Sequence, residues 1–289
     1  MVYMKGKPDT DIILCGLIGY PLKHSISPQM HNAAFDALNL NFAYLPFEIK
    51  KYLLKDMMGI MRGLNFRGLN VTIPHKESVV KYLDALDASA AEAGAVNTIV
   101  NRNGSLIGYN TDIAGFLKAL KKYRVDVRGE KAVILGTGGA AKAVALGLLK
   151  SDADVAVVGR SMQKSRKFAK RFQRLGQIEQ YTFGDVRTAV LDSRLVINCT
   201  PIGMHPNTNV SPIDKRCIEK SITIFDVVYN PIKTRLLTYA EEKGAKAISG
   251  IDMLVYQGAE SFELWTGKKA PIEIMMHAAL TNLQEFDEK

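Results

Sequence analysis

Three small residues at fixed spacing are the first feature with chemical meaning. In the run KAVILGTGGAAKAV, residues 131–144, Gly136, Gly138 and Ala141 spell G-x-G-x-x-A between an apolar strand pattern and a small-residue helix pattern. Gly136 allows a tight turn, Gly138 lets the backbone approach a pyrophosphate, and Ala141 lets the helix pack closely on the strand. Backbone N–H groups and the helix dipole would face the phosphate charge. The pattern predicts a dinucleotide site, and it also suits a strand-to-helix turn without a ligand.

The residues after the second strand of this pattern bear on the choice of cofactor. A site for NAD usually places Asp or Glu there, about 20 residues past the glycine turn, to bind the ribose 2′-hydroxyl. Here the strand ends in VAVVGRS, with Arg160 and Ser161 and no carboxylate. Arg160 and Lys164 suit a 2′-phosphate instead, so the sequence predicts NADP.

Two hydroxyl side chains stand two residues apart near the start of a predicted helix. Ser25 and Ser27 come just before Pro28, which can occupy the first turn of that helix. Together with the helix dipole, these hydroxyls suit a carboxylate ligand. Ser27 alone also suits a structural N-cap.

Amide, hydroxyl and charged side chains gather at other element ends in the first half. Thr72 and Lys76 lie at the end of a predicted strand and in the turn that follows. A predicted hairpin with an Asn-Gly turn places Asn97 on one strand and Asp112 just beyond the other. Taken singly, Lys76 suits a surface lysine at a helix start and Asp112 suits an N-cap.

Apolar patterns predict the elements that must position these residues. In the first half, strand patterns cover residues 12–21, residues 42–49 and a run ending at Pro74, and a helix pattern follows each. From Lys131 onward, buried strand patterns alternate with helices: KAVILG, VAVVGR, LVINCTP, ITIFDVVY and AKAISG. Such runs suit a parallel sheet covered on both faces. A last pair of helices, the first with Asp252 as its expected N-cap, should return to the first half. The fold class is α/β.

Length and composition describe an ordinary globular chain of about two domains. The 289 residues are 47% hydrophobic and 23% charged. No apolar run approaches the roughly 18 residues of a membrane span, and the start lacks the apolar stretch of a secretory signal. We therefore expect a cytoplasmic protein with no membrane partner. Cys15, Cys199 and Cys217 have unrelated spacings and should be reduced packing residues.

The formal charge of +9 raises the question of nucleic acid. Much of the excess lies between Lys118 and Arg174, and a solvated helix face is the usual explanation for such a run. The sequence contains no nucleic-acid motif and no metal spacing such as CxxC or HExxH, and its five histidines are scattered. We expect neither a nucleic-acid partner nor a metal.

Seven motifs resemble those of shikimate dehydrogenases in order and approximate spacing, and they cover nearly the whole chain: SISPQMHN, NVTIPHK, AVNTIV, GYNTD, GTGGAA, NCTPIGM and MLVYQGA. The resemblance implies a Rossmann-type doubly wound sheet, an α/β substrate domain, and reversible NADP-dependent conversion of 3-dehydroshikimate to shikimate in aromatic amino-acid biosynthesis. It also implies that Lys76 and Asp112 form the catalytic pair. The substrate-binding residues that it implies are Ser25, Ser27, Thr72, Asn97, Asp112 and Gln257.

The chemistry of ketone reduction agrees with the implied pair. Hydride transfer to a ketone leaves an alkoxide that needs a proton or a nearby cation, and Lys76 can supply either. A neighbouring Asp112 carboxylate would raise the lysine pKa, while desolvation would lower it. We expect a protonated Lys76 during reduction, with Asp112 holding it and contacting a substrate hydroxyl.

The resemblance also extends along the cofactor. It adds Gly139, Ala140 and Ser161 to the residues near the phosphates, and it places four residues near the nicotinamide: Thr200, Met204, Val227 and Gly250. Tyr229 either reaches the substrate from that edge or packs as a core aromatic. Gly159 departs from the family, which more often has Asn there, and it removes one contact to the adenosine part.

Domain limits and rival functions complete the expectations. Residues 112–251 should form the dinucleotide-binding domain, and residues 1–111 with 252–289 the substrate domain. One rival is a quinate or dual quinate/shikimate dehydrogenase, although Ser25 and Ser27 match the shikimate-specific pattern. Another is a catalytically silent nucleotide-binding or nucleic-acid-binding protein. The expected partner is a small-molecule substrate, and a homodimer is the assembly considered.

Overall fold

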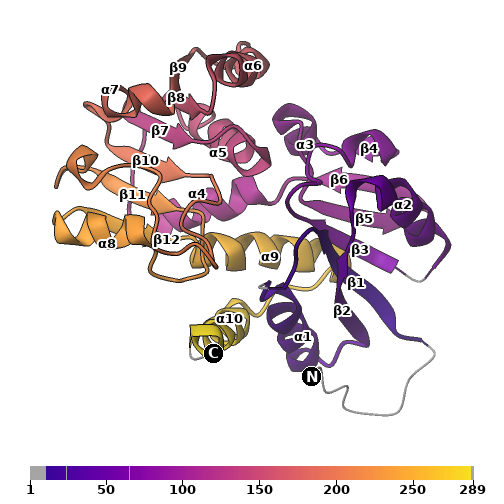
Figure 1. Cartoon of the computed structure of the whole chain (residues 1–289). Coiled ribbons are helices and arrows are strands. Elements are labelled where there is room, and N and C mark those ends of the chain that lie inside the picture. The colour runs from indigo at the N-terminus through magenta and orange to yellow at the C-terminus, as the bar shows by residue number, and fades with distance from the viewer. Residues whose placement is uncertain (1–10, 24, 65, 288–289) are drawn as a thin grey trace.

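Two six-stranded sheets make up the centre of the molecule (Figure 1). The computed structural model describes residues 11–23, 25–64 and 66–287. The first sheet has the order β2-β1-β3-β5-β6-β4 and the second β12-β11-β10-β7-β8-β9. Figure 1 shows them as two lobes, with helix α9, Ile251–Thr266, lying between them.

The first sheet is mixed. Its strands are β1 (Ile13–Gly19), β2 (Phe42–Glu48), β3 (Phe66–Val71), β4 (Ala85–Leu86), β5 (Thr98–Arg102) and β6 (Ser105–Tyr109). β1 pairs in parallel with β2 and β3, whereas β5 runs antiparallel to β3 and β6. The predicted hairpin is confirmed: its turn is Asn103-Gly104, and both residues have positive φ. Asn97 precedes β5 rather than lying on it.

The second sheet is parallel throughout, as its continuous apolar runs predict. Its strands are β7 (Lys131–Leu135), β8 (Asp154–Gly159), β9 (Ile178–Thr182), β10 (Leu195–Asn198), β11 (Thr223–Asp226) and β12 (Lys246–Ser249). Alternate residues face two separate cores: Ala132 and Ile134 enter one, and Val133 and Leu135 enter the other. Helices therefore cover both faces of this sheet. The α/β fold class is confirmed.

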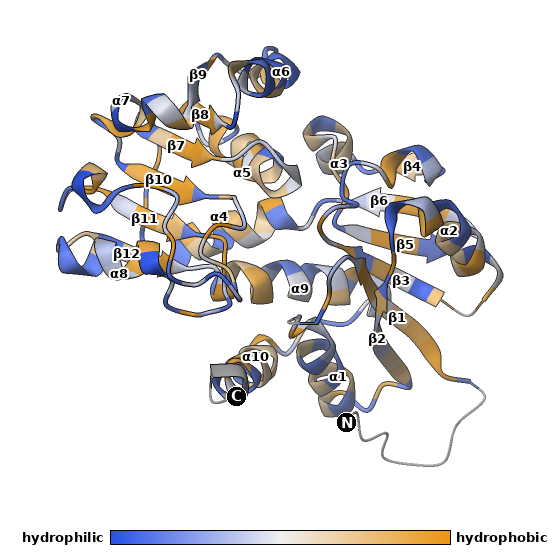
Figure 2. Ribbon diagram, viewed as in Figure 1, coloured by the Kyte–Doolittle hydropathy of each residue, from blue (hydrophilic) through white to orange (hydrophobic). Residues whose placement is uncertain are grey.

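The helices begin and end at defined residues. The longer ones are α1 (Ser27–Ala37), α2 (Leu54–Gly63), α4 (Asp112–Lys122), α5 (Gly139–Leu149), α6 (Met162–Phe172), α8 (Arg235–Glu242) and α10 (Ile272–Asp287). Two short ones are α3 (Ala88–Ala93) and α7 (Val186–Val190). Helix α6 buries Ser165, Phe168, Ala169 and Phe172 and exposes its basic residues, so the basic run is a solvated helix face, coloured blue in Figure 2.

Helix α9 belongs to the cores of both lobes. Met253, near its start, packs in the core under the second sheet, whereas Phe262 and Trp265 pack in the core under the first. Trp265 Nε1 donates to Ile99 O over 3.0 Å. Helix α10 then packs on α1 of the first lobe (Figure 1). The last two helices thus return to the first half of the chain.

Some local predictions are wrong. The run after Pro74 forms turns and a short 3-10 helix, Val80–Tyr82, instead of an α-helix. The Lys76 carbonyl accepts from Val96 N, and the buried His75 ring contacts Ile49 O at 2.8 Å, so tertiary bonds override the helix pattern. The apolar patterns of the sequence also do not predict α3 and β9. No helix in the described part of the chain is long and apolar enough to cross a membrane.

Candidate active site

Lys76 and Asp112 form a close, largely buried ion pair between the lobes. Lys76 Nζ lies 2.5 Å from Asp112 Oδ2, and the two side chains are 16% and 6% exposed. Asp112 is the first residue of α4, after the N-cap position Thr111, and makes no capping bond. The expected N-cap is therefore wrong by one residue. The Asp112 carboxylate pairs with Lys76 instead. Asp112 still lies in the first turn of α4, where the helix dipole stabilises negative charge.

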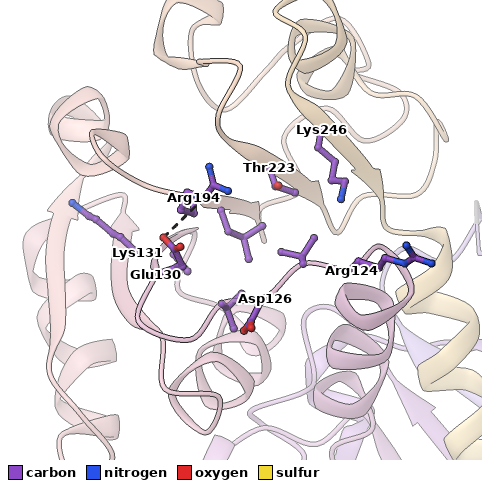
Figure 3. A pocket seen from close by; sticks show the side chains of 11 residues that line it. Arg124, Asp126, Glu130, Lys131, Arg194, Thr223 and Lys246 are labelled. Atoms are coloured by element: carbon purple, nitrogen blue, oxygen red, sulfur yellow. Dashed lines mark ion pairs between the residues drawn. The ribbon is translucent and has the colours of Figure 1, made fainter.

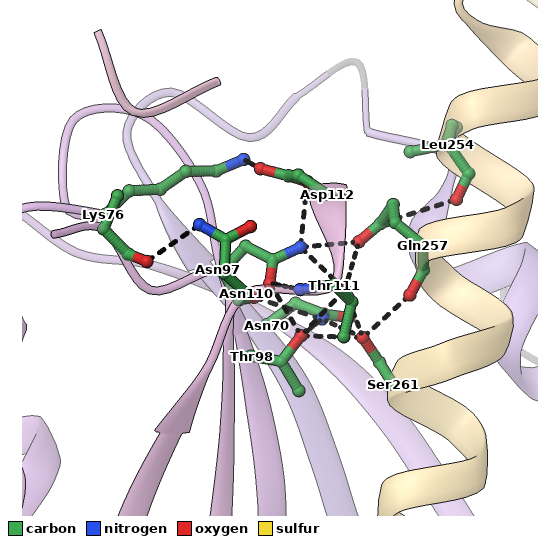
Figure 4. Close-up of polar contacts among 11 residues, drawn as sticks. Asn70, Lys76, Asn97, Thr98, Asn110, Thr111, Asp112, Leu254, Gln257 and Ser261 are labelled. Atoms are coloured by element: carbon green, nitrogen blue, oxygen red, sulfur yellow. Dashed lines mark hydrogen bonds and ion pairs between the residues drawn. The ribbon is translucent and has the colours of Figure 1, made fainter. Parts of the chain in front are cut away.

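The Asn97 amide links the same carboxylate to a second amide, that of Gln257 (Figure 4). Asn97 Nδ2 lies 2.8 Å from Asp112 Oδ1 and 3.0 Å from Gln257 Oε1 on α9. Asn97 Oδ1 accepts from Thr111 N over 2.7 Å, which fixes the orientation of the amide. The structure thus brings together four residues from distant parts of the sequence: Lys76, Asn97, Asp112 and Gln257.

A buried polar layer supports these amides, and no motif in the sequence predicted it. Asn70 Nδ2 lies within hydrogen-bond distance of Thr98 Oγ1, Ser261 Oγ and the Asn97 carbonyl, at 3.0 to 3.2 Å. Thr98 and Ser261 hydroxyls lie 2.7 Å apart, and Thr111 joins them. Ser261 also follows Gln257 by one helical turn and donates to its carbonyl. That i+4 spacing was the signal available in the sequence.

The two serines lie beside tyrosines from different parts of the chain. Ser25 lies beside Tyr229 and Ser27 beside Tyr44; burial raises the pKa of both phenols, and the neighbouring serine hydroxyls lower it. Tyr44 Oη donates to Asn70 Oδ1 over 2.8 Å, which connects this corner to the buried polar layer. Ser27 is the first residue of α1 and makes no cap bond, so its expected N-cap role is wrong. Thr72 follows β3, with its methyl against Gly19.

The glycine turn connects β7 to the start of α5. Gly136 has φ +110°, and a Cβ there would lie 3.1 Å from Thr200 Cγ2. Gly138 is the N-cap of α5 without a side-chain cap bond, and a Cβ there would meet open space. The N–H groups at this helix start therefore face room for an anion. Ala140 follows in the first turn, and Ala141 packs in the core.

The same turn lies against the stem of Lys76. A Cβ at Gly139 would lie 2.9 Å from Lys76 Cβ, so the glycine allows the lysine stem to pass over the start of α5. Next to it, Lys142 Nζ of α5 pairs with Glu77 Oε2 at 2.6 Å. The candidate phosphate site and the Lys76 segment are therefore in direct contact.

The expected 2′-phosphate residues lie at the start of α6. Arg160 and Lys164 are exposed, and Ser161 is the N-cap, with its Oγ 3.4 Å from Lys164 N. A Cβ at Gly159 would lie 2.5 Å from Ser165 Oγ, and this close approach explains the glycine at that position. These residues follow β8, next to the glycine turn and away from Lys76.

The four nicotinamide-side candidates lie at the carboxyl ends of β10, β11 and β12. Thr200 is bonded to Asn198, and Met204 is 42% exposed. A Cβ at Gly250 would lie 2.4 Å from the Val227 carbonyl, so only glycine permits this backbone contact. A separate pocket opens at the opposite edge of this sheet, where Arg194 pairs with Glu130 at 4.0 Å (Figure 3). It contains none of the candidate residues.

Three family models match the chain. They describe a shikimate dehydrogenase substrate binding domain over residues 17–99, a shikimate / quinate 5-dehydrogenase over residues 118–231, and a shikimate 5′-dehydrogenase C-terminal domain over residues 250–280. A curated relative from Carboxydothermus hydrogenoformans, named shikimate dehydrogenase (NADP(+)), is 46% identical over 92% of this chain and 95% of its own. The chain belongs to the shikimate dehydrogenase family.

Solved structures of shikimate dehydrogenases have the same fold. One in complex with NADP+ is 37% identical over 97% of this chain and 99% of its own, with a TM-score of 0.91. Another, from Thermus thermophilus in complex with NADP(H) and shikimate, is 34% identical over 93% and 99%, with a TM-score of 0.85. Membership of the shikimate dehydrogenase family agrees with the resemblance seen in the seven motifs.

Proposed function

We propose that this protein catalyses the reversible NADP-dependent reduction of 3-dehydroshikimate to shikimate, a step in aromatic amino-acid biosynthesis. The observation that carries the proposal is the Lys76–Asp112 pair, with Asn97 and Gln257 around it and the start of α5 beneath it. The family membership and the relatives named as NADP-dependent enzymes support it. A silent nucleotide-binding protein would need none of this arrangement.

Lys76 provides the proton in this mechanism. NADP, when bound, supplies the hydride chemistry. Asp112 holds the Lys76 ammonium group in place through their ion pair. Lys76 Nζ then donates a proton to the oxygen that becomes the new hydroxyl, or stabilises its negative charge. In the reverse direction the same nitrogen accepts that proton.

The remaining polar residues bind the substrate in our proposal. Ser25, Ser27 and Tyr229 form a corner of hydroxyl donors that suits the carboxylate. At the other end, Asn97, Gln257 and the Asp112 carboxylate suit ring hydroxyls, with Thr72 at the neighbouring strand end. The site would thus bind a carboxylate at one end and ring hydroxyls at the other, which are the groups that shikimate carries.

The cofactor would lie along the carboxyl edge of the second sheet. We assign the phosphates to the residues of the glycine turn, Gly136, Gly138, Gly139, Ala140 and Ala141, and the 2′-phosphate to Arg160, Ser161 and Lys164. The nicotinamide is assigned to Thr200, Met204, Val227 and Gly250. Parallel sheets bind ligands outside this edge. Residues 112–251 would then act as the dinucleotide domain, and residues 1–111 with 252–289 as the substrate domain.

An absorbance assay tests the proposed function. Purified protein is mixed with shikimate and NADP, and reduced nicotinamide is recorded; quinate and NAD are tested in parallel. We expect turnover with shikimate and NADP to exceed every other combination. Preferred oxidation of quinate would contradict the substrate assignment, and a protein that binds NADP without turnover would be a silent relative.

Two further proposals concern the setting of the enzyme. We propose a cytoplasmic location. The three cysteines, one buried and two half-buried, are all free thiols, which suits a reducing compartment. We also propose a homodimer, which light scattering of the purified protein checks: a mass near 32 kDa would contradict it.

A further inference from the structure

A buried amide and a buried carboxylate lie side by side at the carboxyl edge of the second sheet. Asn198 ends β10 and Asp226 ends β11, and the two residues are in register. Both are 0% exposed. Asn198 Nδ2 donates to Asp226 Oδ1 over 2.9 Å. The mechanism proposed above gives neither residue a role.

Asn198 fixes the loop that carries Thr200 and Met204. Its Oδ1 accepts from Thr200 N over 3.0 Å and from Thr200 Oγ1 over 2.6 Å. Its Nδ2 also donates to the Ile202 carbonyl over 3.1 Å, and Ile202 N donates to Thr200 Oγ1 over 3.2 Å. One amide thus sets both the path of the loop and the rotamer of Thr200.

Asp226 fixes the next loop, which carries Val227 and Tyr229. Asp226 Oδ1 accepts from Val228 N over 3.0 Å, and Val227 N donates to the Asn198 carbonyl over 3.0 Å. Asp226 Oδ2 faces the other way and accepts from Thr234 Oγ1, the N-cap of α8, over 2.6 Å. Asp226 Oδ1 therefore holds the candidate nicotinamide loops, whereas Asp226 Oδ2 holds the start of α8.

We propose that Asn198 and Asp226 are positioning residues that hold these two loops in one arrangement, so that Thr200, Val227 and Tyr229 present a preformed surface to the nicotinamide and the substrate. The inference rests on the proposed function. A hydrogen-bonded pair that is fully buried suits this role, because a buried amide or carboxylate without a hydrogen-bond partner costs free energy. Loop arrangements that leave Asn198 or Asp226 without a partner are therefore disfavoured.

The test separates the nicotinamide from the rest of the cofactor. Calorimetry measures the Kd of NADP and that of 2′-phospho-ADP-ribose, which lacks the nicotinamide, for wild type and for Asn198→Ala. We expect the variant to weaken NADP about tenfold, to lower kcat at least as much, and to leave the Kd of the fragment within about twofold. A purely structural role would not change the ratio of the two Kd values.

Two further variants provide the controls. Thr234→Val removes the bond to Asp226 Oδ2 and the N-cap bond from Leu237 N, and it leaves the bonds of Asp226 Oδ1 in place. It should therefore lower Tm while both Kd values stay within about twofold. Asp226→Asn keeps the shape and an acceptor at the Oδ1 position, and it should retain NADP binding within about threefold. We expect Asn198→Ala to lower stability and displace the loops, and Thr234→Val to lower stability without displacing them. Comparing the two variants separates these effects.

The outcomes that overturn the inference are distinct. Equal weakening of NADP and of the fragment by Asn198→Ala would show general disturbance of the domain, and no weakening of either would show that the loops hold without the pair. Both results overturn the inference while normal wild-type turnover keeps the proposed function. A wild-type protein that does not oxidise shikimate would overturn both together.

Discussion

At the scale of single residues, the Lys76–Asp112 pair makes the sharpest prediction. Lys76→Ala should lower kcat by about 10²- to 10⁴-fold and change shikimate binding far less, because its proton or charge is most needed in the transition state. Steady-state kinetics and equilibrium binding separate the two effects. Lys81→Ala, which changes an exposed lysine in the same segment, is the control and should match wild type. Near wild-type turnover in Lys76→Ala would remove Lys76 from the mechanism.

Arg160 is expected to decide between NADP and NAD. Loss of a charge-assisted contact to the 2′-phosphate is typically worth about 1.5–3 kcal/mol, so Arg160→Ala should weaken NADP about 10- to 150-fold and NAD little. The remaining preference should shrink as salt rises, because Lys164 is exposed and screened. Arg166→Ala, on the same helix, is the control. An equal loss for both cofactors would place the basis of the preference elsewhere.

His31 should make stability depend on pH. Its ring is buried, neither ring nitrogen has a hydrogen-bond partner among the described residues, and burial lowers its pKa from 6.5 to about 3. Between these values the unfolded chain holds a proton that the folded chain lacks, so stability is lost as pH falls below 6.5. At pH 5 the loss is about 2 kcal/mol.

His31→Phe removes the titrating group and keeps a ring that can stack on Tyr44, whose ring lies 4.4 Å from that of His31. Urea unfolding at pH 7 and pH 5 measures the difference between the two proteins. That difference should grow by about 2 kcal/mol in favour of the variant on acidification. Parallel losses in both proteins would assign the acid sensitivity to other groups.

At the scale of elements, close contacts distinguish glycines that are needed from those that are not. A Cβ at Gly68 on β3 would lie 1.9 Å from Trp265 Nε1, whereas a Cβ at Gly59 inside α2 meets nothing within 4 Å. Gly68→Ala should therefore cost more than about 3 kcal/mol by forcing α9 off the sheet. Gly59→Ala should stabilise the protein by about 0.5–1 kcal/mol. Thermal unfolding checks both, and a stable Gly68→Ala protein would show that Trp265 can move.

The elements that the sequence predicted best are those whose pattern is set locally. The strands of the parallel sheet other than β9, the glycine turn and the Asn-Gly hairpin follow from apolar runs and turn residues alone. The expected N-caps Ser27 and Asp112 lie one residue past the observed N-cap positions, and Asp252 lies two residues past the observed N-cap, Gly250. The Asp252 carboxylate, for example, accepts from Lys122 and Tyr123 instead of capping the helix. Helix propensity could not reveal those distant partners.

The candidate site also contains residues that local motifs predict and residues that they do not. The motifs identified Lys76, Asn97, Asp112 and Gln257, and the structure brings them together. The layer beneath them, from Asn70 to Ser261, joins residues 191 positions apart, and no local spacing encodes such a contact. Motifs mark residues that face a ligand, while the residues that orient them depend on how the strands and α9 meet.

At the scale of the molecule, α9 should make the lobes unfold together. The chain has one tryptophan, Trp265, which lies in the core of the first lobe, while α9 also enters the core of the second lobe. We expect Trp265 fluorescence and far-ultraviolet circular dichroism to give coincident unfolding curves in denaturant. Two separated transitions would show that the lobes are independent, and then α9 would have to break at its middle.

The path of α9 and α10 also orders events during synthesis. The core of the first lobe needs Phe262 and Trp265 of α9 and Met275 of α10, which leave the ribosome after both sheets have been made. The half of the enzyme that is translated first is therefore completed last. Its unfilled apolar surface must wait about 150 residues of further translation, or roughly 8 to 30 s at bacterial or eukaryotic rates, so this lobe is the part with the greatest need of a chaperone.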